Sequence, residues 1–212
     1  SISAGENYTV ALKNDGTVVA WGNNDFGQTT IPANLTNVAS IVACHRHVLA
    51  IKDDGTVVAW GNNEFGQSSI PIGLTDVVEV AGGIYYSLAL KSDGTVVAWG
   101  QNSREGMSIP ENLSDVKSIA TGAYHSIALK QDGTIVTWGD NSAGQLNVVE
   151  NATNIVAIAA IAYYTVAIKS DGTVIGWGSE VDQEFVIPNN LPKIKAISAG
   201  RLHIAGLLKE DE

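Results

Sequence analysis

Short apolar runs alternate with polar residues along the whole chain, and glycine, proline or asparagine separates one run from the next. In one representative stretch the pattern predicts strands over residues 77–81, 86–91 and 95–99, with a tight hairpin at Asp93-Gly94 between the last two. A short fourth strand over 107–110 ends in proline, which favours the edge of a sheet. No segment has a useful helical period, so the predicted class is all-β.

The same pattern recurs at a constant step of 39 residues. All five tryptophans keep this step: Trp21, Trp60, Trp99, Trp138 and Trp177. The Asp-Gly pairs keep it too, from Asp15-Gly16 to Asp171-Gly172. A repeat of this length with four short strands is typical of a propeller blade. The predicted fold is therefore an all-β β-propeller with four-stranded blades, in which each blade buries its faces against its neighbours.

We predict one repeat domain over residues 1–212. Its units span about 1–39, 40–78, 79–117, 118–156 and 157–195, and a partial unit covers 196–209. Five full units and an extra strand pair do not make a whole number of blades. Either the chain is an arc cut from a larger ring, or a second copy of the chain completes the ring as a homodimer.

Composition limits the classes of partner. Hydrophobic residues make up 45% and charged residues 16%, which suits a folded chain with a large core. The formal net charge of −10 disfavours nucleic acid and anionic membranes as partners. No apolar run approaches the roughly 18 residues of a membrane span. Cys44 is the single cysteine, so the sequence offers no intrachain disulfide.

The repeat resembles that of the regulator of chromosome condensation superfamily. The resemblance rests on the phrases AGENYTVALKNDGTVVAWGNNDFGQ (residues 4–28) and GGIYYSLALKSDGTVVAWGQN (residues 82–102). It implies a β-propeller, commonly with more blades than this chain supplies. The short unit without insertions and the phrase GQTTIP (residues 27–32) look most similar to the secreted bacterial propellers that inhibit class A β-lactamases. That resemblance alone implies an extracellular or periplasmic location.

Two loops of each unit are expected on one face of the propeller, and the Asp-Gly hairpins on the other. We call the loop between the first and second strands the A–B loop, and the loop after the third strand the C–D loop. Positions that keep their residue type in every unit are interpreted as structural. One such column is expected to hold buried rings bonded to the backbone: Tyr8, His47, Tyr86, His125, Tyr164 and His203. Another is expected to close the C–D turn: Asn24, Asn63, Asn102 and Asn141.

Neighbouring positions on the same loops change from unit to unit and are our candidates for partner binding. Tyrosine, phenylalanine and arginine are typical anchors of protein interfaces, and two exposed phenylalanines on loop tips would be costly without a partner. Acidic members would steer a basic partner. The alternatives are that these loop positions vary in sequence without a function, or that the loop side chains pack on the protein itself. The candidates are Asn7, Asp25, Phe26, Arg46, Glu64, Phe65, Tyr85, Arg104, Tyr124, Tyr163 and Asp182.

Catalytic and metal-binding patterns are weak. The stretch Cys44-His45-Arg46-His47 contains ligand types, but no second ligand pair is placed beside it, so we predict no metal and no cofactor. No Ser-His-Asp or paired acidic motif recurs, and the chain is expected not to be an enzyme. We expect a protein-binding propeller, with a class A β-lactamase as a candidate partner. The alternatives are an exchange factor or effector directed at a small GTPase, and a structural fragment of a larger propeller.

Overall fold

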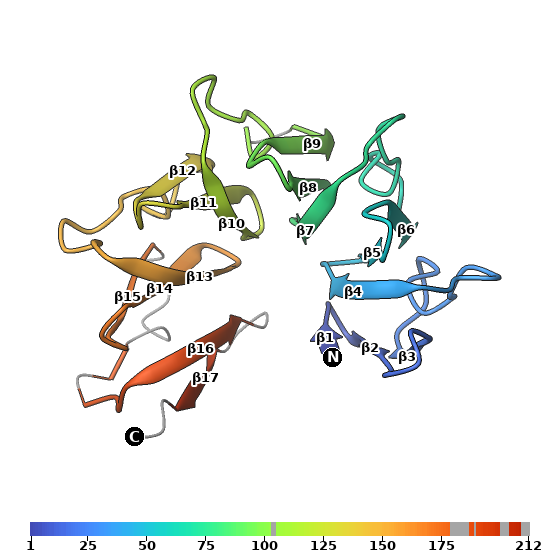
Figure 1. Cartoon of the computed structure of the whole chain (residues 1–212), viewed down its shortest axis with the longest axis horizontal. Helices are drawn as coiled ribbons and strands as arrows, with labels where there is room; N and C mark the ends of the chain where they lie inside the picture. Colours follow the sequence, from blue (N-terminus) through green and yellow to red (C-terminus); the bar gives the residue numbers. More distant parts are fainter. Residues whose placement is uncertain (103–104, 179–186, 189, 200–203, 209–212) are drawn as a thin grey trace. The chain divides into compact units, whose positions relative to one another are not determined.

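Short antiparallel strands in sets of three build the chain, as the computed structural model shows (Figure 1). The structure describes residues 1–102, 105–178, 187–188, 190–199 and 204–208. The chain divides into two units, residues 1–103 and 104–212, and each is described by itself. The described residues contain no helix long and apolar enough to cross a membrane.

The first unit contains three sheets, and in each the strands follow chain order. The first strand of each later sheet contacts the first two strands of the sheet before it. The strands are β1 (Ile2–Ala4), β2 (Tyr8–Leu12), β3 (Val18–Gly22), β4 (Val38–Ala43), β5 (His47–Lys52), β6 (Val57–Gly61), β7 (Val77–Gly82), β8 (Tyr86–Lys91) and β9 (Val96–Gly100).

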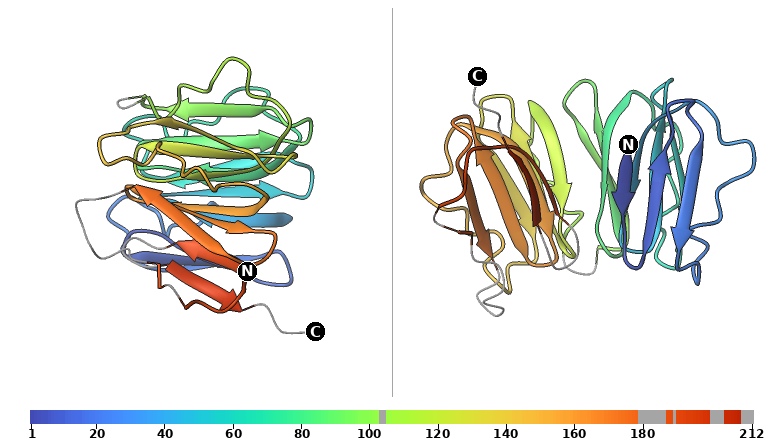
Figure 2. Two further views of the ribbon diagram at one scale, coloured as in Figure 1. Left: turned by 90° about the vertical axis from the view of Figure 1, so that its left-hand side faces the viewer. Right: turned by 90° about the horizontal axis from the view of Figure 1, so that it is seen from below.

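The second unit contains two three-stranded sheets and a strand pair (Figure 2). The first strand of the pair, β16, contacts β13 and β14 of the sheet before it. The strands are β10 (Val116–Thr121), β11 (His125–Lys130), β12 (Ile135–Gly139), β13 (Ile155–Ile161), β14 (Tyr164–Lys169), β15 (Val174–Gly178), β16 (Ile194–Ala199) and β17 (Ile204–Leu208). The all-β class and the repeated small sheets are confirmed, whereas the predictions of a homodimer and of a single domain stay predictions.

The core of the first unit lies between successive sheets. In β5, Val48 and Ala50 pack with Tyr8, Val10 and Trp60 on one side. Leu49 and Ile51 pack on the other side, in the cluster that contains Val80 and Trp99. Successive side chains of a strand point to opposite faces, so the alternation of small and large residues serves two different neighbours. This is why the middle strand of each sheet is apolar at nearly every position.

The predicted fourth strand is wrong for the described residues, because every sheet there has at most three strands. Around 107–110 the backbone forms turns instead. The amide of Ser108 donates to the Glu105 carbonyl at 2.9 Å, and the amide of Ile109 donates to the Met107 carbonyl at 2.8 Å. Pro110 has no N–H to donate. Local turns therefore use the donors that a fourth strand would have needed.

Each repeated tryptophan bonds the C–D loop of the repeat before it. The indole Nε1–H donates to a backbone carbonyl located 32 residues earlier, and these indoles are 5–7% exposed. The pairs are Trp60 with Gln28 (3.0 Å), Trp99 with Gln67 (2.9 Å), Trp138 with Gly106 (2.9 Å) and Trp177 with Gln145 (3.0 Å). Trp21 has no such loop in this structure and is 51% exposed.

We expect Trp60→Phe to lower the free energy of unfolding of the first unit by about 1–3 kcal/mol, because the buried Gln28 carbonyl loses its donor. Trp21→Phe is the matched control, since the same substitution there removes no buried hydrogen bond and should change stability far less. Urea unfolding followed by far-UV circular dichroism measures both. Equal losses in the two variants would contradict this account of the tryptophan.

The Asp-Gly hairpins are confirmed, and each is closed by its aspartate. The Asp15 carboxylate accepts the Thr17 hydroxyl at 2.6 Å and the Thr17 backbone N–H at 2.9 Å. These two bonds, the hydroxyl first, lower the pKa of Asp15 from 3.8 to about 2. The corresponding threonines lower the pKa of the other four hairpin carboxylates in the same way: Asp54, Asp93, Asp132 and Asp171.

Acid should therefore weaken all five hairpins. A carboxylate whose pKa is lower in the folded chain stabilises the fold above the unfolded value of 3.8, and this contribution disappears as the pH falls towards about 2. We expect Thr17→Val to raise the pKa of Asp15 and Lys13→Ala to change it little, because the threonine hydroxyl is the larger cause. Carboxyl ¹³C shifts followed from pH 6 to pH 2 measure both. An unchanged Asp15 midpoint in Thr17→Val would contradict the assignment.

Candidate protein-binding loops

The A–B and C–D loops lie side by side in the first four repeats, as the strand order predicts. In these repeats the first residue after the third strand donates its amide to the A–B loop at 2.8–3.0 Å. Gly61 is required at this approach, because it has a φ of +95° and a Cβ there would lie 2.7 Å from the Arg46 carbonyl. The donor and acceptor pairs are Asn23 with Asn7, Asn62 with Arg46, Gln101 with Tyr85 and Asp140 with Tyr124.

Contacts also run from the C–D loop of one repeat to the A–B loop of the next. The Phe65 and Tyr85 rings pack with their centroids 4.4 Å apart. The Arg46 guanidinium carbon lies 4.7 Å from the centroid of the Phe26 ring. Both phenylalanines are half-buried, so the expectation of two exposed rings is wrong. The physical reason is that the neighbouring repeat supplies a cation or an aromatic ring to cover each one.

A charged cluster joins the first two A–B loops. One oxygen of the Glu6 carboxylate accepts Arg46 Nε–H at 2.7 Å and lies 3.0 Å from His45 Nε2. The Glu6 amide also donates to the His45 carbonyl at 3.0 Å. The Glu6 side chain is only 10% exposed. Sequence reasoning missed Glu6 and His45 as site residues, although opposite charges in adjacent copies of one column were a usable signal.

The remaining candidates are placed as follows. Asn7, Asp25 and Glu64 are exposed on the loops of the first unit. In the second unit the Tyr124 and Tyr163 rings lie 6.5 Å apart, and Tyr163 is exposed. Loop contacts thus join Phe26 to Arg46 and Phe65 to Tyr85 in the first unit, and Tyr124 to Tyr163 in the second. Arg104 and Asp182 lie outside the described residues.

The asparagine column closes the C–D turn, as predicted. Asn63 Oδ1 accepts the amide of Ser68 at 3.0 Å, and its Nδ2 donates to the Ser69 hydroxyl at 3.0 Å. Asn24 and Asn141 make corresponding bonds. Sequence reasoning assigned no role to the buried glutamines of this loop. Gln67 accepts the Phe65 amide at 3.0 Å and donates to Asn62 at 2.7 Å, which holds the loop beneath its variable tip.

The rings of the alternating Tyr and His column are buried where the structure describes them; His203 lies outside those residues. Tyr8 donates its hydroxyl to backbone carbonyls, as predicted, with His47 O at 2.6 Å. The histidines differ from the prediction, because their partners are hydroxyls of the next repeat. His47 Nε2 lies 2.9 Å from the Ser87 hydroxyl, and His125 Nε2 lies 3.1 Å from that of Thr165. Burial lowers the pKa of His47 to about 3 and that of His125 to about 4.

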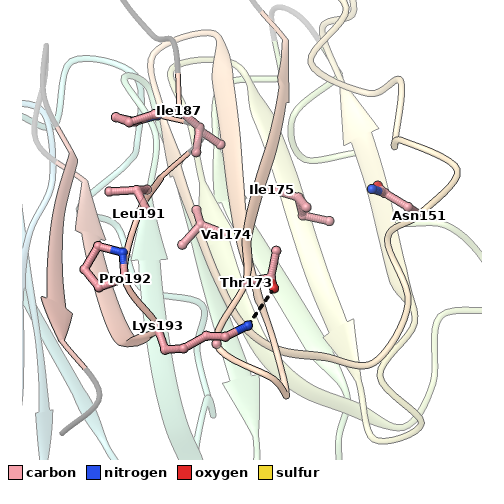
Figure 3. A pocket seen from close by; sticks show the side chains of 10 residues that line it. Asn151, Thr173, Val174, Ile175, Ile187, Leu191, Pro192 and Lys193 are labelled. Carbon is pink, nitrogen blue, oxygen red and sulfur yellow. Dashed lines mark hydrogen bonds between the residues drawn. The ribbon is translucent and has the colours of Figure 1, made fainter. Parts of the chain in front are cut away.

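The cysteine stretch and the pocket carry no comparable chemistry. Cys44 is buried, which raises the pKa of its thiol. No group of metal-ligating side chains occurs among the residues that the structure describes. A pocket of about 520 Å³ lies between the start of β15 and the segment that precedes β16 (Figure 3). Its lining includes the apolar side chains of Val174, Ile175 and Leu191, and its one charged side chain, Lys193, donates to the Thr173 hydroxyl at 3.3 Å.

We expect His47 and His125 to stay neutral at pH 5.5. A histidine whose pKa is lowered on folding takes up its proton on unfolding, so stability should fall as the pH drops below about 6.5. Ring ¹H and ¹⁵N shifts measured from pH 7 to pH 3 report both side chains. A midpoint near 6.5 for either ring would contradict its burial beneath the loop.

The repeats match a known family. Residues 1–28, 38–67, 77–105 and 116–145, together more than half of the chain, match the model of the regulator of chromosome condensation (RCC1) repeat. No curated protein matches the chain.

Solved structures share the fold. Prp20p from Saccharomyces cerevisiae, described with its binding properties to Gsp1p and histones, is 24% identical with a TM-score of 0.82, over 99% of this chain and 69% of that one. The ectodomain of the receptor kinase CR4 from Physcomitrella patens is 22% identical with a TM-score of 0.82, over 98% of this chain and 58% of that one. The ectodomain of the receptor kinase ACR4 from Arabidopsis thaliana is 21% identical with a TM-score of 0.77, over 99% of this chain and 74% of that one.

Proposed function

The chain belongs to the RCC1 repeat family, and from this premise we propose that it is a non-enzymatic β-propeller protein that binds another protein through its A–B and C–D loops. One observation carries the proposal. The residue types that vary between repeats gather on these loops, while the residues below them hold the same contacts in successive repeats. A scaffold with variable loops is a common design for recognition.

The packing of the loops supports an interface. The pairs Phe65–Tyr85 and Arg46–Phe26 bridge successive repeats, so the loop tips are braced against each other. Braced aromatic and arginine side chains lose less conformational freedom when a partner binds than free loops do. Exposed Asp25 and Glu64 beside them add negative charge, which would speed encounter with a basic partner.

We further propose an inhibitor-like role, with class A β-lactamases as the first candidates. This rests on the likeness of the short repeat unit to bacterial inhibitory propellers, and it carries with it a bacterial, exported protein. Prp20p, which has a similar fold, binds proteins: one structure shows it with Kap60, and another describes its binding to Gsp1p and histones.

The test measures binding of the purified chain to a panel of class A β-lactamases, together with the rate of β-lactam hydrolysis. We expect Phe65→Ala and Tyr85→Ala each to weaken binding by roughly tenfold or more, as central aromatic anchors do. Lys13→Ala, on an exposed hairpin, is the control and should bind like the parent chain. Thermal unfolding confirms that the variants fold. Unchanged affinity in both aromatic variants would exclude this loop surface.

A further inference from the structure

The first two repeats depart from the third, fourth and fifth repeats at one place on the loops. The two residues before the Tyr and His column are Ile84-Tyr85, Ala123-Tyr124 and Ala162-Tyr163 in the third to fifth repeats. In the first and second repeats they are Glu6-Asn7 and His45-Arg46. The structure brings three of these four departures together, since Glu6 contacts both His45 and Arg46. Complementary changes in two repeats that meet in space indicate a built site rather than drift.

Arg46 is held from two sides. Its Nε–H donates to the Glu6 carboxylate at 2.7 Å, and the Phe26 ring lies 4.7 Å below its guanidinium carbon. Its own carbonyl accepts the Asn62 amide at 2.9 Å, which fixes the loop that carries it. The guanidinium therefore has little freedom left to lose on binding.

The outer edge of the same guanidinium is open. In the part of the chain that the structure describes, the Arg46 guanidinium makes no hydrogen bond other than the one from Nε, and the side chain is 43% exposed. The two terminal nitrogens keep their N–H donors, arranged as a planar fork that matches a carboxylate or phosphate. An ion pair that served stability alone would engage this fork.

We propose that Arg46 is a preformed carboxylate receptor, which binds an Asp or Glu side chain of the protein partner through its two terminal nitrogens. This inference rests on the proposed function and deepens it. A single carboxylate fits better than a phosphate, because a phosphate brings up to two charges to a chain of net charge −10. Asn7, next to Glu6 in the sequence, is exposed on the first A–B loop. Phe26 beneath the fork favours an apolar residue next to the acid.

The probe is the peptide acetyl-Phe-Glu-amide, and acetyl-Phe-Gln-amide is its neutral match. Arginine side-chain ¹H–¹⁵N NMR follows each titration at low salt. We expect the Arg46 signals to move with the glutamate peptide and not with the glutamine peptide. Arg46→Lys keeps the charge but not the fork, and Arg46→Gln removes both. Backbone amide shifts of the loops should show roughly tenfold weaker binding of the glutamate peptide to either variant, while Lys13→Gln binds it like the parent.

Two outcomes would overturn the proposal: equal shifts with both peptides, or glutamate binding that survives in Arg46→Gln. The experiment needs no natural partner, so its result is separable from the β-lactamase test. Peptide discrimination at Arg46 without β-lactamase binding would support the receptor and reject that partner. β-Lactamase binding unaffected by Arg46→Gln, with no peptide discrimination, would reject the receptor and keep the partner.

Discussion

The hydrogen bond from a tryptophan to the preceding repeat, made by every tryptophan except Trp21, is the interaction on which the described structure depends. It joins two segments 32 residues apart and removes a bulky indole from water in the same contact. A three-stranded sheet of this size cannot bury both faces alone, so the repeats must cover each other. Because the bonded carbonyl belongs to the C–D loop, the same interaction that stabilises the core also fixes the base of the variable loops.

This coupling explains how variable tips and a constant scaffold coexist. Gln67 is buried and bonded to its own loop, and its carbonyl accepts both Trp99 and Ser87 of the next repeat. Ser87 in turn contacts His47, the buried ring beneath the second A–B loop. The Gln67 carbonyl, the Ser87 hydroxyl and His47 Nε2 are therefore paired beneath the loops, whereas the buried His47 Nδ1 has no hydrogen-bond partner among the described residues. The residues at the loop tips are not needed to pair these buried groups, so their side chains can differ from repeat to repeat.

Charged side chains are used differently at the two ends of the strands, the end with the Asp-Gly hairpins and the end with the A–B loops. At the hairpins, five aspartates each accept the backbone N–H of a threonine two residues later, which closes their own turns. At the A–B loops, the Glu6–His45–Arg46 cluster joins two repeats, which makes it a long-range contact in sequence. An aspartate that closes a turn acts locally, whereas the largely buried Glu6 carboxylate orients the exposed Arg46 guanidinium of the next repeat. The first kind serves the fold, and the second kind is suited to recognition.

The sequence by itself determined the all-β class, the repeat, the hairpins and the shared face of the two loops, because these follow from local patterns copied every 39 residues. It also placed the asparagine turns correctly. Only the tertiary structure decided what depends on contacts between repeats. It showed that turns replace the predicted fourth strand and that the next repeat covers Phe26 and Phe65. It also showed that the histidines contact hydroxyls and that Glu6 contacts Arg46. Those contacts join residues that share no local pattern, so their geometry becomes visible only when one repeat packs against the next.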